Sequence, residues 1–432
     1  MIQSESHKVD QAAARGRLYE NIVSLYILQG LNYLIPIAVL PYLIRVLGID
    51  TYGLVAFSQA FAQYFVVLTD YGFNLSATRY IAQYRAERDK IKSMFWQVMV
   101  LKLILMLVGM AILLGIVTTV PRFRHDIWFF LVAYLAVIGN VAFPQWYFQG
   151  MEKMRYISLF SGVANIASGL LIFVFVHTRA DGLVALLIQT GGTLIAGATA
   201  LCVAMRQIGF DFEVPSLTSL RSTLKDGWHL FVSSAAVSLY TNTNLVLVGL
   251  LAGNVQAGYF SAADKLIRAM ATLIVPFSQA IFPHISSLAT RSREAALALV
   301  SRTLRHVAAV SLFSSIAVLV LAQPIAKLLF GPAASGSIPV IRWIALLPFL
   351  LAVSNILGIQ TMLTFGLDRQ FSRILLGSGL LNLVLGIPLI HFFGAQGAGA
   401  SVLTTEVVVT ITMLLSLQMH KINVLVPASI ER

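Results

Sequence analysis

Charged residues are scarce in this sequence, and their scarcity excludes most soluble folds. Only 11% of the 432 residues are Asp, Glu, Lys or Arg, whereas 58% are hydrophobic. Soluble domains carry roughly 25% charged residues, because a surface in water has to be largely polar. The composition therefore predicts an integral membrane protein.

Several other features are missing. The only cysteine is Cys202, so the sequence predicts no disulfide and no thiolate metal site. We find no phosphate-binding Gly-rich loop ending in Lys-Ser or Lys-Thr, so ATP is not expected to drive the protein directly. Metal-ligand spacings are also missing, and we expect no cofactor. Residues 1–20 lack the apolar core of a cleavable signal peptide, so the first membrane helix should direct insertion.

Long hydrophobic runs are abundant. A helix needs about 20 apolar residues to cross roughly 30 Å of hydrocarbon. The sequence therefore predicts an all-α integral membrane protein with twelve transmembrane helices. The runs that meet this length lie near 21–44, 53–78, 93–119, 127–148, 157–177, 182–205, 228–252, 258–286, 304–330, 338–364, 374–393 and 397–420.

The basic residues indicate how the helices are oriented. Most of the 30 Lys and Arg residues fall in segments on one side of the predicted helices. The other side holds only Arg45, Arg122, Arg124 and Arg179. Because cytoplasmic loops carry the excess of Lys and Arg, we expect both termini in the cytoplasm. The net charge of +12 then reflects loops that face anionic lipid, and we expect no nucleic-acid partner.

The two halves share a pattern that indicates an internal duplication. Leu47–Gly53 is echoed by Ala252–Gly258, and each motif precedes a long apolar run. Six helices return each half to the same side, so the halves should form two lobes related by a pseudo-two-fold axis along the membrane normal. The expected parts are a cytoplasmic N-terminal segment 1–20, an N-lobe 21–206, a cytoplasmic linker 207–226, a C-lobe 227–420 and a cytoplasmic tail 421–432.

Two positive charges lie near the middle of the predicted helix 258–286. Each of Lys265 and Arg268 costs about 2.5–3.5 kcal/mol at the centre of a membrane helix. Helical spacing places Ser261, Thr272 and Gln279 on the same face. This stripe predicts a polar cavity that attracts anions. Asp264 lies one turn before Arg268, so a salt-bridge set that only joins helices stays open as an alternative.

Further polar residues lie deep in predicted helices. Lys102 could pair with Asp70 or line the cavity as a third cation. Glu406 could titrate as a coupling carboxylate or neutralise an intramembrane cation. The remaining cavity candidates are neutral: Gln59, Gln63 at the repeat position of Arg268, and Asn242.

Several motifs resemble a known family. They are Gln29–Pro36, Leu40–Leu43, Arg45–Gly48, Tyr52-Gly53, Thr69–Arg79 and Trp146–Glu152. They resemble the Wzx-type O-antigen flippases of the polysaccharide transport family, in the multidrug/oligosaccharidyl-lipid/polysaccharide exporter superfamily. Tyr259–Leu266 is also similar to a segment of the peptidoglycan-precursor flippases, whose basic residue lies in a cationic cavity. That likeness assigns the corresponding role to Lys265.

The resemblance implies a function. It is the transfer of an undecaprenyl-diphosphate-linked oligosaccharide from the cytoplasmic to the periplasmic leaflet of the bacterial inner membrane by alternating access. The sequence leaves open whether a coupling ion, H⁺ or Na⁺, or removal of the product drives the cycle, and the downstream O-antigen polymerase and the chain-length regulator are candidate partners. One alternative is an ion-coupled exporter of small cationic compounds, which cations at mid-membrane disfavour. The other is a membrane glycosyltransferase or polymerase, which the lack of a long outer loop and of an acid-x-acid pair disfavours.

Overall fold

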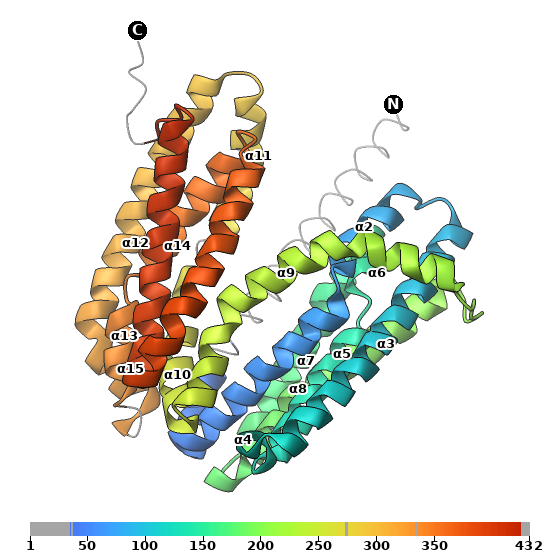
Figure 1. The fold of residues 1–432 in the computed structure, drawn as a ribbon, viewed down its shortest axis with the longest axis horizontal. Helices are drawn as coiled ribbons and strands as arrows, with labels where there is room; N and C mark the ends of the chain where they lie inside the picture. Colours follow the sequence, from blue (N-terminus) through green and yellow to red (C-terminus); the bar gives the residue numbers. More distant parts are fainter. Residues whose placement is uncertain (1–34, 36–37, 273–274, 333–334, 425–432) are drawn as a thin grey trace, which may run out of the picture. The chain divides into compact units, whose positions relative to one another are not determined.

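The fold is helical and multi-pass. A computed structural model describes residue 35 and residues 38–272, 275–332 and 335–424. Eight helices in this part of the chain are long and apolar enough to cross a membrane (Figure 1). The expected all-α membrane class is confirmed, while the count of twelve helices stays a prediction. Outside the described residues lie the segment 1–20, most of the first apolar run 21–44, residues 425–432 of the tail, and the side chain of Gln279.

The chain forms two compact units. Unit 1 contains Phe65–His177, Leu183–Val232 and the described residues before Pro41. Unit 2 contains Pro41–Tyr64, Thr178–Gly182 and the described residues from Ser233 onward. Residues 209–216, within the expected linker 207–226, lie outside helices, and the next helix already begins at Leu217. The lobe boundaries expected from the repeat stay a prediction.

The helices of unit 1 surround an aromatic core. Phe95, Trp146 and Phe148 are fully buried there. The ring centroids of Phe95 and Trp146 lie 5.5 Å apart. The helices are the end of the helix 38–70, α2 (Phe73–Gln83), α3 (Arg88–Thr119), α4 (Pro121–Arg124), α5 (Ile127–Ala142), α6 (Gln145–Gly150), α7 (Met154–Phe175), α8 (Gly182–Ile208) and the start of α9 (Leu217–Leu251).

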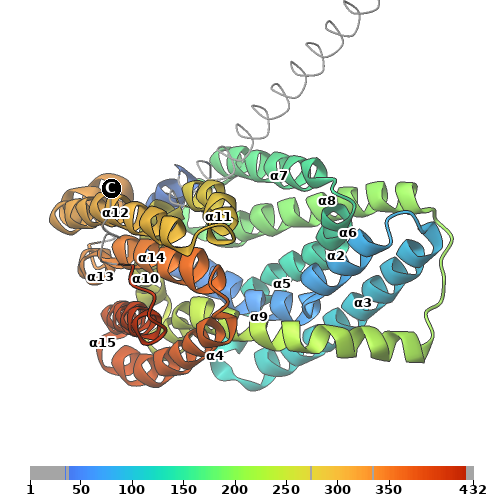
Figure 2. The same ribbon diagram turned by 90° about the horizontal axis from the view of Figure 1, so that it is seen from above.

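The predicted run 127–148 is interrupted between α5 and α6. Pro144 stands at the break and has no amide hydrogen to continue the helical bonding. The break lets α6 pack against α2, which Figures 1 and 2 both show. Thr78 donates to the carbonyl oxygen of Trp146 at 3.2 Å, and Arg85 donates to that of Gly150 at 2.7 Å. Two of the family-like motifs, Thr69–Arg79 and Trp146–Glu152, are therefore in contact.

Unit 2 contains the rest of the helices. The predicted run 258–286 corresponds to α10 and α11, and the run 338–364 is divided into three successive helices, the last of them a π-helix. The elements are residues 41–64, η1 (Arg179–Asp181), the rest of α9, α10 (Asn254–Thr272), α11 (Val275–Ala289), α12 (Arg293–Phe330), α13 (Ser337–Ile344), α14 (Leu347–Asn355), η3 (Ile356–Leu363) and α15 (Asp368–Met419).

The long helix α15 is two antiparallel segments. Gly394 leaves the helical conformation, with φ 57° and ψ −130°, and the chain reverses there. The amide of Asn382 donates to the hydroxyls of Ser401 and Thr405, both at 3.2 Å, across the two segments. Their limits agree with the predicted runs 374–393 and 397–420.

The duplicated motifs Leu47–Gly53 and Ala252–Gly258 cross each other in unit 2. A methyl group at Gly53 would collide with the carbonyl oxygen of Asn254, and one at Gly258 would collide with that of Ile49. Asn254 is the repeat counterpart of Ile49, so the two contacts are reciprocal. Reciprocal contacts of this kind are what a two-fold relation produces. We infer that the repeat seen in the sequence is a structural repeat at this crossing.

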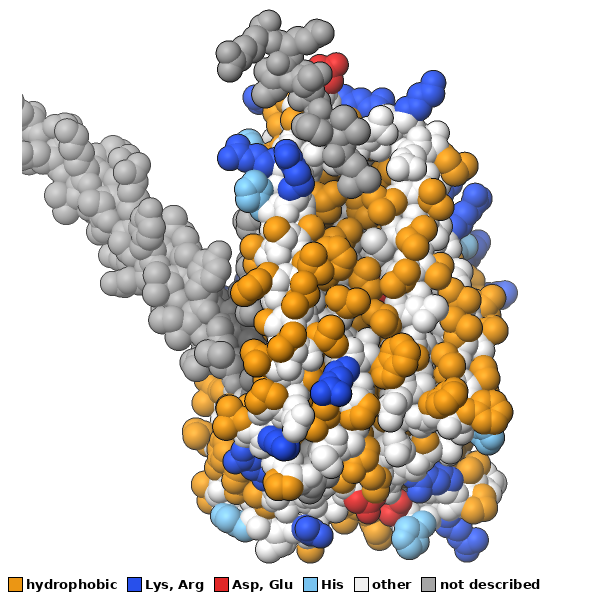
Figure 3. Space-filling model, turned by 90° about the vertical axis from the view of Figure 1, so that its left-hand side faces the viewer, with side chains coloured by type: hydrophobic (Ala, Val, Ile, Leu, Met, Phe, Trp, Pro, Cys, Tyr) orange, Lys and Arg blue, Asp and Glu red, His pale blue; other side chains and the backbone are white. Residues whose placement is uncertain are grey.

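The face formed by α12 and α15 is apolar over its middle (Figure 3). Large hydrophobic side chains are exposed there, among them Phe313 and Val320 on α12 and Val384 and Phe392 on α15. In Figure 3 most Lys and Arg side chains gather toward the two ends of this face. Such an apolar band is suited to contact with lipid tails rather than water.

Candidate functional site

The cation pair expected on α10 is partly neutralised. The Nε atom of Arg268 lies 2.8 Å from both carboxylate oxygens of Asp264, one turn earlier. The side chains of Arg268 and Asp264 are 38% and 19% exposed, so water reaches the ion pair only in part. The pairing that the sequence left open as an alternative is therefore present.

Lys265 lies beside this pair and is exposed. Its Nζ atom is 5.4 Å from the centroid of the Tyr52 ring, within the range of a cation–π contact. Tyr52 is 1% exposed, and its hydroxyl lies 3.1 Å from that of Ser261. Among the described residues, no carboxylate forms an ion pair with Lys265. The cluster of Asp264, Lys265 and Arg268 therefore carries one net positive charge.

The polar stripe expected on α10 is divided in two. Ser261 is completely buried, whereas Lys265 and Thr272 are exposed. The reason is the glycine crossing near Gly258, which covers the first turns of α10 and leaves its later turns open. The hydroxyl of Thr272 donates to the carbonyl oxygen of Ala269 at 2.8 Å. Only the part of the stripe from Lys265 onward is open to a ligand.

Lys102 is buried and fully partnered within unit 1. It is 1% exposed, and its Nζ atom lies 3.0 Å from Oδ1 of Asp70. It also lies 3.2 Å from the carbonyl oxygen and 3.4 Å from Oδ1 of Asn140. An ammonium group has three hydrogens, and here each has an acceptor. This geometry favours structural pairing with Asp70 over the role of a third free cation.

Glu406 is buried beside a small cavity in unit 2. It is 3% exposed, and Ser354 donates to its Oε1 atom at 2.7 Å. The cavity has a volume of about 190 Å³ and is also lined by Asn355 and Ile359, at the start of the π-helix η3. π-Helical turns inside α-helices are frequent at functional sites. In the described part of the chain, no three His, Cys, Asp or Glu side chains are grouped as a metal site requires.

The neutral candidates are scattered. Gln63 is exposed and Gln59 is partly buried on the helix 38–70. The amide of Asn242 on α9 donates to Ser238 and Thr241 at 3.2 Å, so its contacts are local. A shared cavity for these neutral side chains stays a prediction.

Three partners of the charged residues were not selected from the sequence. Tyr52 belongs to a family-like motif, but the motif does not predict its contact with Lys265. Asn140 is a polar residue inside the apolar run 127–148, and such residues in membrane helices usually have a buried partner. The sequence does not indicate that Ser354 contacts Glu406, because single serines are common in membrane helices.

Comparison with protein families identifies a relationship over most of the chain. Residues 18–289 match the family described as "Polysaccharide biosynthesis protein". A protein of Escherichia coli (strain K12) named "Putative O-antigen transporter" is 36% identical over 94% of this chain and 98% of its own length. A protein of Shigella dysenteriae with the same name is 30% identical over 91% of this chain and 98% of its own.

Solved structures with the same fold are also membrane transporters. An inward-facing multidrug resistance MATE family transporter of the MOP superfamily matches 90% of this chain and 94% of its own, with a TM-score of 0.67 and 16% identity. The lipid II flippase MurJ, in an inward closed conformation, matches 92% of this chain and 87% of its own, with a TM-score of 0.68 and 12% identity. At these identities the likeness establishes the fold. The family-like motifs and the relatives agree: the chain belongs to the polysaccharide biosynthesis protein family, with the O-antigen transporters.

Proposed function

We propose that this protein transfers an undecaprenyl-diphosphate-linked repeat unit of O-antigen, or of a related polysaccharide, across the bacterial inner membrane. The unit would pass from the cytoplasmic to the periplasmic leaflet, with both termini of the protein in the cytoplasm. The names of the two relatives support transport of O-antigen. The excess of Lys and Arg in one set of loops supports the orientation.

The observation that carries the proposal is the uncompensated charge on α10. Lys265 is exposed in a membrane protein and has no carboxylate partner among the described residues. A diphosphate is an anion that has to cross a region of low dielectric constant, where an opposite charge lowers the barrier. Lys265 would contact the diphosphate, while Arg268, three residues further on and paired with Asp264, would add to the positive potential.

The transport cycle would be alternating access between two lobes, with the lipid tail of the substrate remaining in the bilayer. Glu406 is the candidate for the coupling carboxylate, binding H⁺ or Na⁺ beside Ser354. Its burial next to a small cavity that is also lined by the polar side chains of Ser354 and Asn355 supports this role. We also propose contacts with the polymerase and chain-length regulator that would receive the exported unit.

A deletion strain tests the function. Loss of the protein should make the complete lipid-linked oligosaccharide accumulate, and mass analysis of extracted lipids would identify its sugars. Wild-type protein should restore O-antigen at the cell surface, whereas the double variant Lys265→Ala/Arg268→Ala should insert normally and fail to restore it. Normal surface O-antigen with that variant would exclude the proposed role of the two cations. A change only in tolerance to cationic drugs would favour the multidrug exporter instead.

A further inference from the structure

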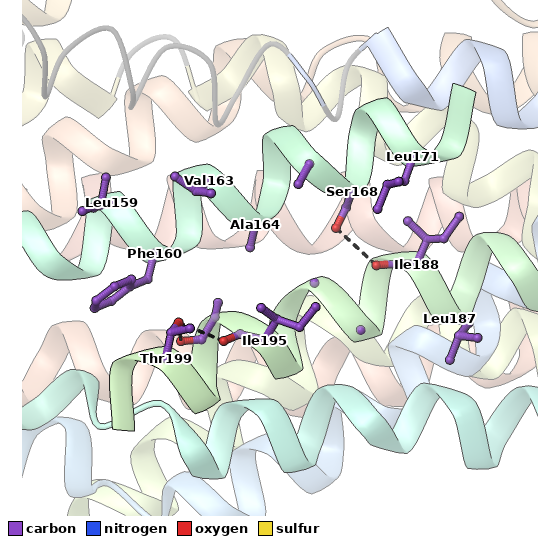
Figure 4. A pocket seen from close by; sticks show the side chains of 14 residues that line it. Leu159, Phe160, Val163, Ala164, Ser168, Leu171, Leu187, Ile188, Ile195 and Thr199 are labelled. Atoms are coloured by element: carbon purple, nitrogen blue, oxygen red, sulfur yellow. Dashed lines mark hydrogen bonds between the residues drawn. The ribbon is translucent and has the colours of Figure 1, made fainter. Parts of the chain in front are cut away.

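A groove runs along the outside of unit 1 between α7 and α8. This α7–α8 groove has a volume of about 540 Å³ and is lined by the residues labelled in Figure 4. Its walls are large apolar side chains, including Phe160, Val163 and Leu171 from α7 and Ile195 from α8. Three of these four, Val163, Leu171 and Ile195, are exposed, so the groove is open to the surroundings of the protein.

Small residues form the floor of the groove. A methyl group at Gly192 would collide with the hydroxyl oxygen of Ser168, so α7 and α8 lie close together at this point. At Gly191 a methyl group would meet nothing within 4 Å, so the groove is empty at this point. The hydroxyl of Ser168 donates to the carbonyl oxygen of Ile188 at 3.2 Å (Figure 4). The other polar side chain of the lining, Thr199, donates to the carbonyl oxygen of Ile195 at 2.9 Å, so the groove is an apolar channel whose two hydroxyls are both hydrogen-bonded.

The described residues of the chain do not fill the groove. Gly169 on α7 packs against Ile35, since a methyl group at Gly169 would lie 2.5 Å from its Cγ2 atom. Leu171, which lines the groove, is two residues further on and so about 200° away around the helix. Ile35 and Val39 therefore meet the opposite side of α7. An apolar groove that the described residues leave empty in a membrane protein is suited to a lipid chain.

The groove lies along the middle part of α7, whose 22 residues extend about 33 Å. Leu159 and Leu171 mark its two ends on α7, about 18 Å apart at 1.5 Å per residue. Half of a hydrocarbon core of about 30 Å is about 15 Å. One acyl chain from the leaflet at the start of α7 would enter the nearer half of the groove, whereas a carrier of eleven isoprene units is far longer than the groove.

One end of the groove is basic. Lys153 precedes Phe160 by two helical turns, and Arg206 follows Thr199 by two turns on α8, about 10 Å in each case. Lys153 donates to Oε1 of Gln207 at 2.6 Å, which shows that these two helix ends are adjacent. Arg206 is exposed. Lys153 directly precedes α7 and Arg206 lies two residues before the end of α8, and α7 is about as long as the hydrocarbon core is thick, so both cations lie at headgroup level.

We propose that the α7–α8 groove binds one acyl chain of an anionic phospholipid, whose phosphate is held by Lys153 and Arg206. The site is independent of the transport cations on α10. Basic pockets between membrane helices recognise anionic headgroups in this way. The bound lipid would fill an apolar surface that α7 and α8 leave open.

Native mass spectrometry of the purified full-length protein tests the proposal. After delipidation, the protein is mixed with phosphatidylglycerol or with phosphatidylcholine of the same chain length. The wild type should retain one phosphatidylglycerol per chain, at least about tenfold more strongly than phosphatidylcholine. Gly191→Leu, which fills the groove, should lower retention of both lipids at least fivefold, by roughly a kcal/mol. Gly115→Leu is the matched control, because that glycine also has nothing within 4 Å and is exposed on α3.

The charge is tested separately. Lys153→Gln/Arg206→Gln should abolish the preference for phosphatidylglycerol over phosphatidylcholine, while both lipids are still retained through their acyl chains. If Gly191→Leu does not fold, Ala167→Leu, also on the groove, takes its place. Retention by these variants equal to that of Gly115→Leu would overturn the proposal. So would displacement of phosphatidylglycerol by a polyprenyl phosphate in a groove-dependent manner, because the groove would then belong to the carrier lipid. Surface O-antigen in the same strains reports separately on transport.

Discussion

Asp264 holds Arg268 through both of its carboxylate oxygens, each 2.8 Å from the guanidinium Nε. The pair is neutral, so the net charge of the α10 cluster belongs to Lys265, three residues before Arg268. Lys265 has its cation–π contact with the ring of Tyr52. Among the described residues, Arg268 is therefore paired with a carboxylate, whereas Lys265 is not.

The two cations should therefore differ in their effect on export. Lys265→Gln should lower the rate of O-antigen export at least about tenfold, because loss of the net charge removes an attraction of at least about 1.4 kcal/mol. Arg268→Gln should have a smaller effect, since it also frees Asp264. Surface O-antigen in a complemented deletion strain measures both. The control is Lys90→Gln, which removes an exposed ion pair with Glu87. Equal export by Lys265→Gln and Lys90→Gln would contradict the assignment.

Breaking the buried pair in unit 1 should destabilise the protein. Lys102→Met leaves Asp70 unpartnered, and Asp70→Asn leaves the buried ammonium without its counter-charge. Each should cost about 3–5 kcal/mol of unfolding free energy, and the double variant should cost less than the sum. Denaturation in detergent measures the cycle. Removing the exposed Lys90–Glu87 pair should cost no more than about 1 kcal/mol. Additive losses at Lys102 and Asp70 would show that the two side chains do not interact.

The glycine crossing should not accept a side chain. Gly53→Ala and Gly258→Ala should each reduce the amount of folded protein strongly, because the added methyl group meets backbone that cannot rotate away. Gly115→Ala should be neutral or stabilising, since its methyl group meets nothing. Size-exclusion chromatography of detergent-solubilised protein and its thermal unfolding measure the difference. Normal yield and unfolding temperature for Gly53→Ala would contradict the close approach.

Glu406 should determine how export depends on the coupling ion. Glu406→Gln keeps an acceptor for Ser354 but removes the negative charge. Export into vesicles should then lose its dependence on the proton or Na⁺ gradient, at equal protein level. Ser354→Ala is the matched change in the same contact, and it should retain the dependence because the carboxylate remains. Unchanged gradient dependence in Glu406→Gln would exclude this carboxylate as the coupling group.

The sequence predicted the membrane class and most helices, because long apolar runs leave few alternatives. It also placed Lys102 near Asp70 and Asp264 near Arg268, since both pairs follow from local spacing or from a short loop. It could not show that Ser261 is buried while Lys265 is exposed, because that depends on where another helix crosses α10. It did not reveal the π-helix η3 or Ser354 beside Glu406, which depend on contacts distant in sequence.

The reciprocal crossing of Leu47–Gly53 and Ala252–Gly258 has a consequence for how the two copies have diverged. Each glycine faces the backbone of the other copy, so neither copy could gain a side chain there without displacing its twin. Elsewhere the copies were free to change, and Gln63 stands where the other copy has Arg268. If the two halves arose by duplication, close backbone contact would keep the glycines in both copies, while a charge could be gained in one half alone.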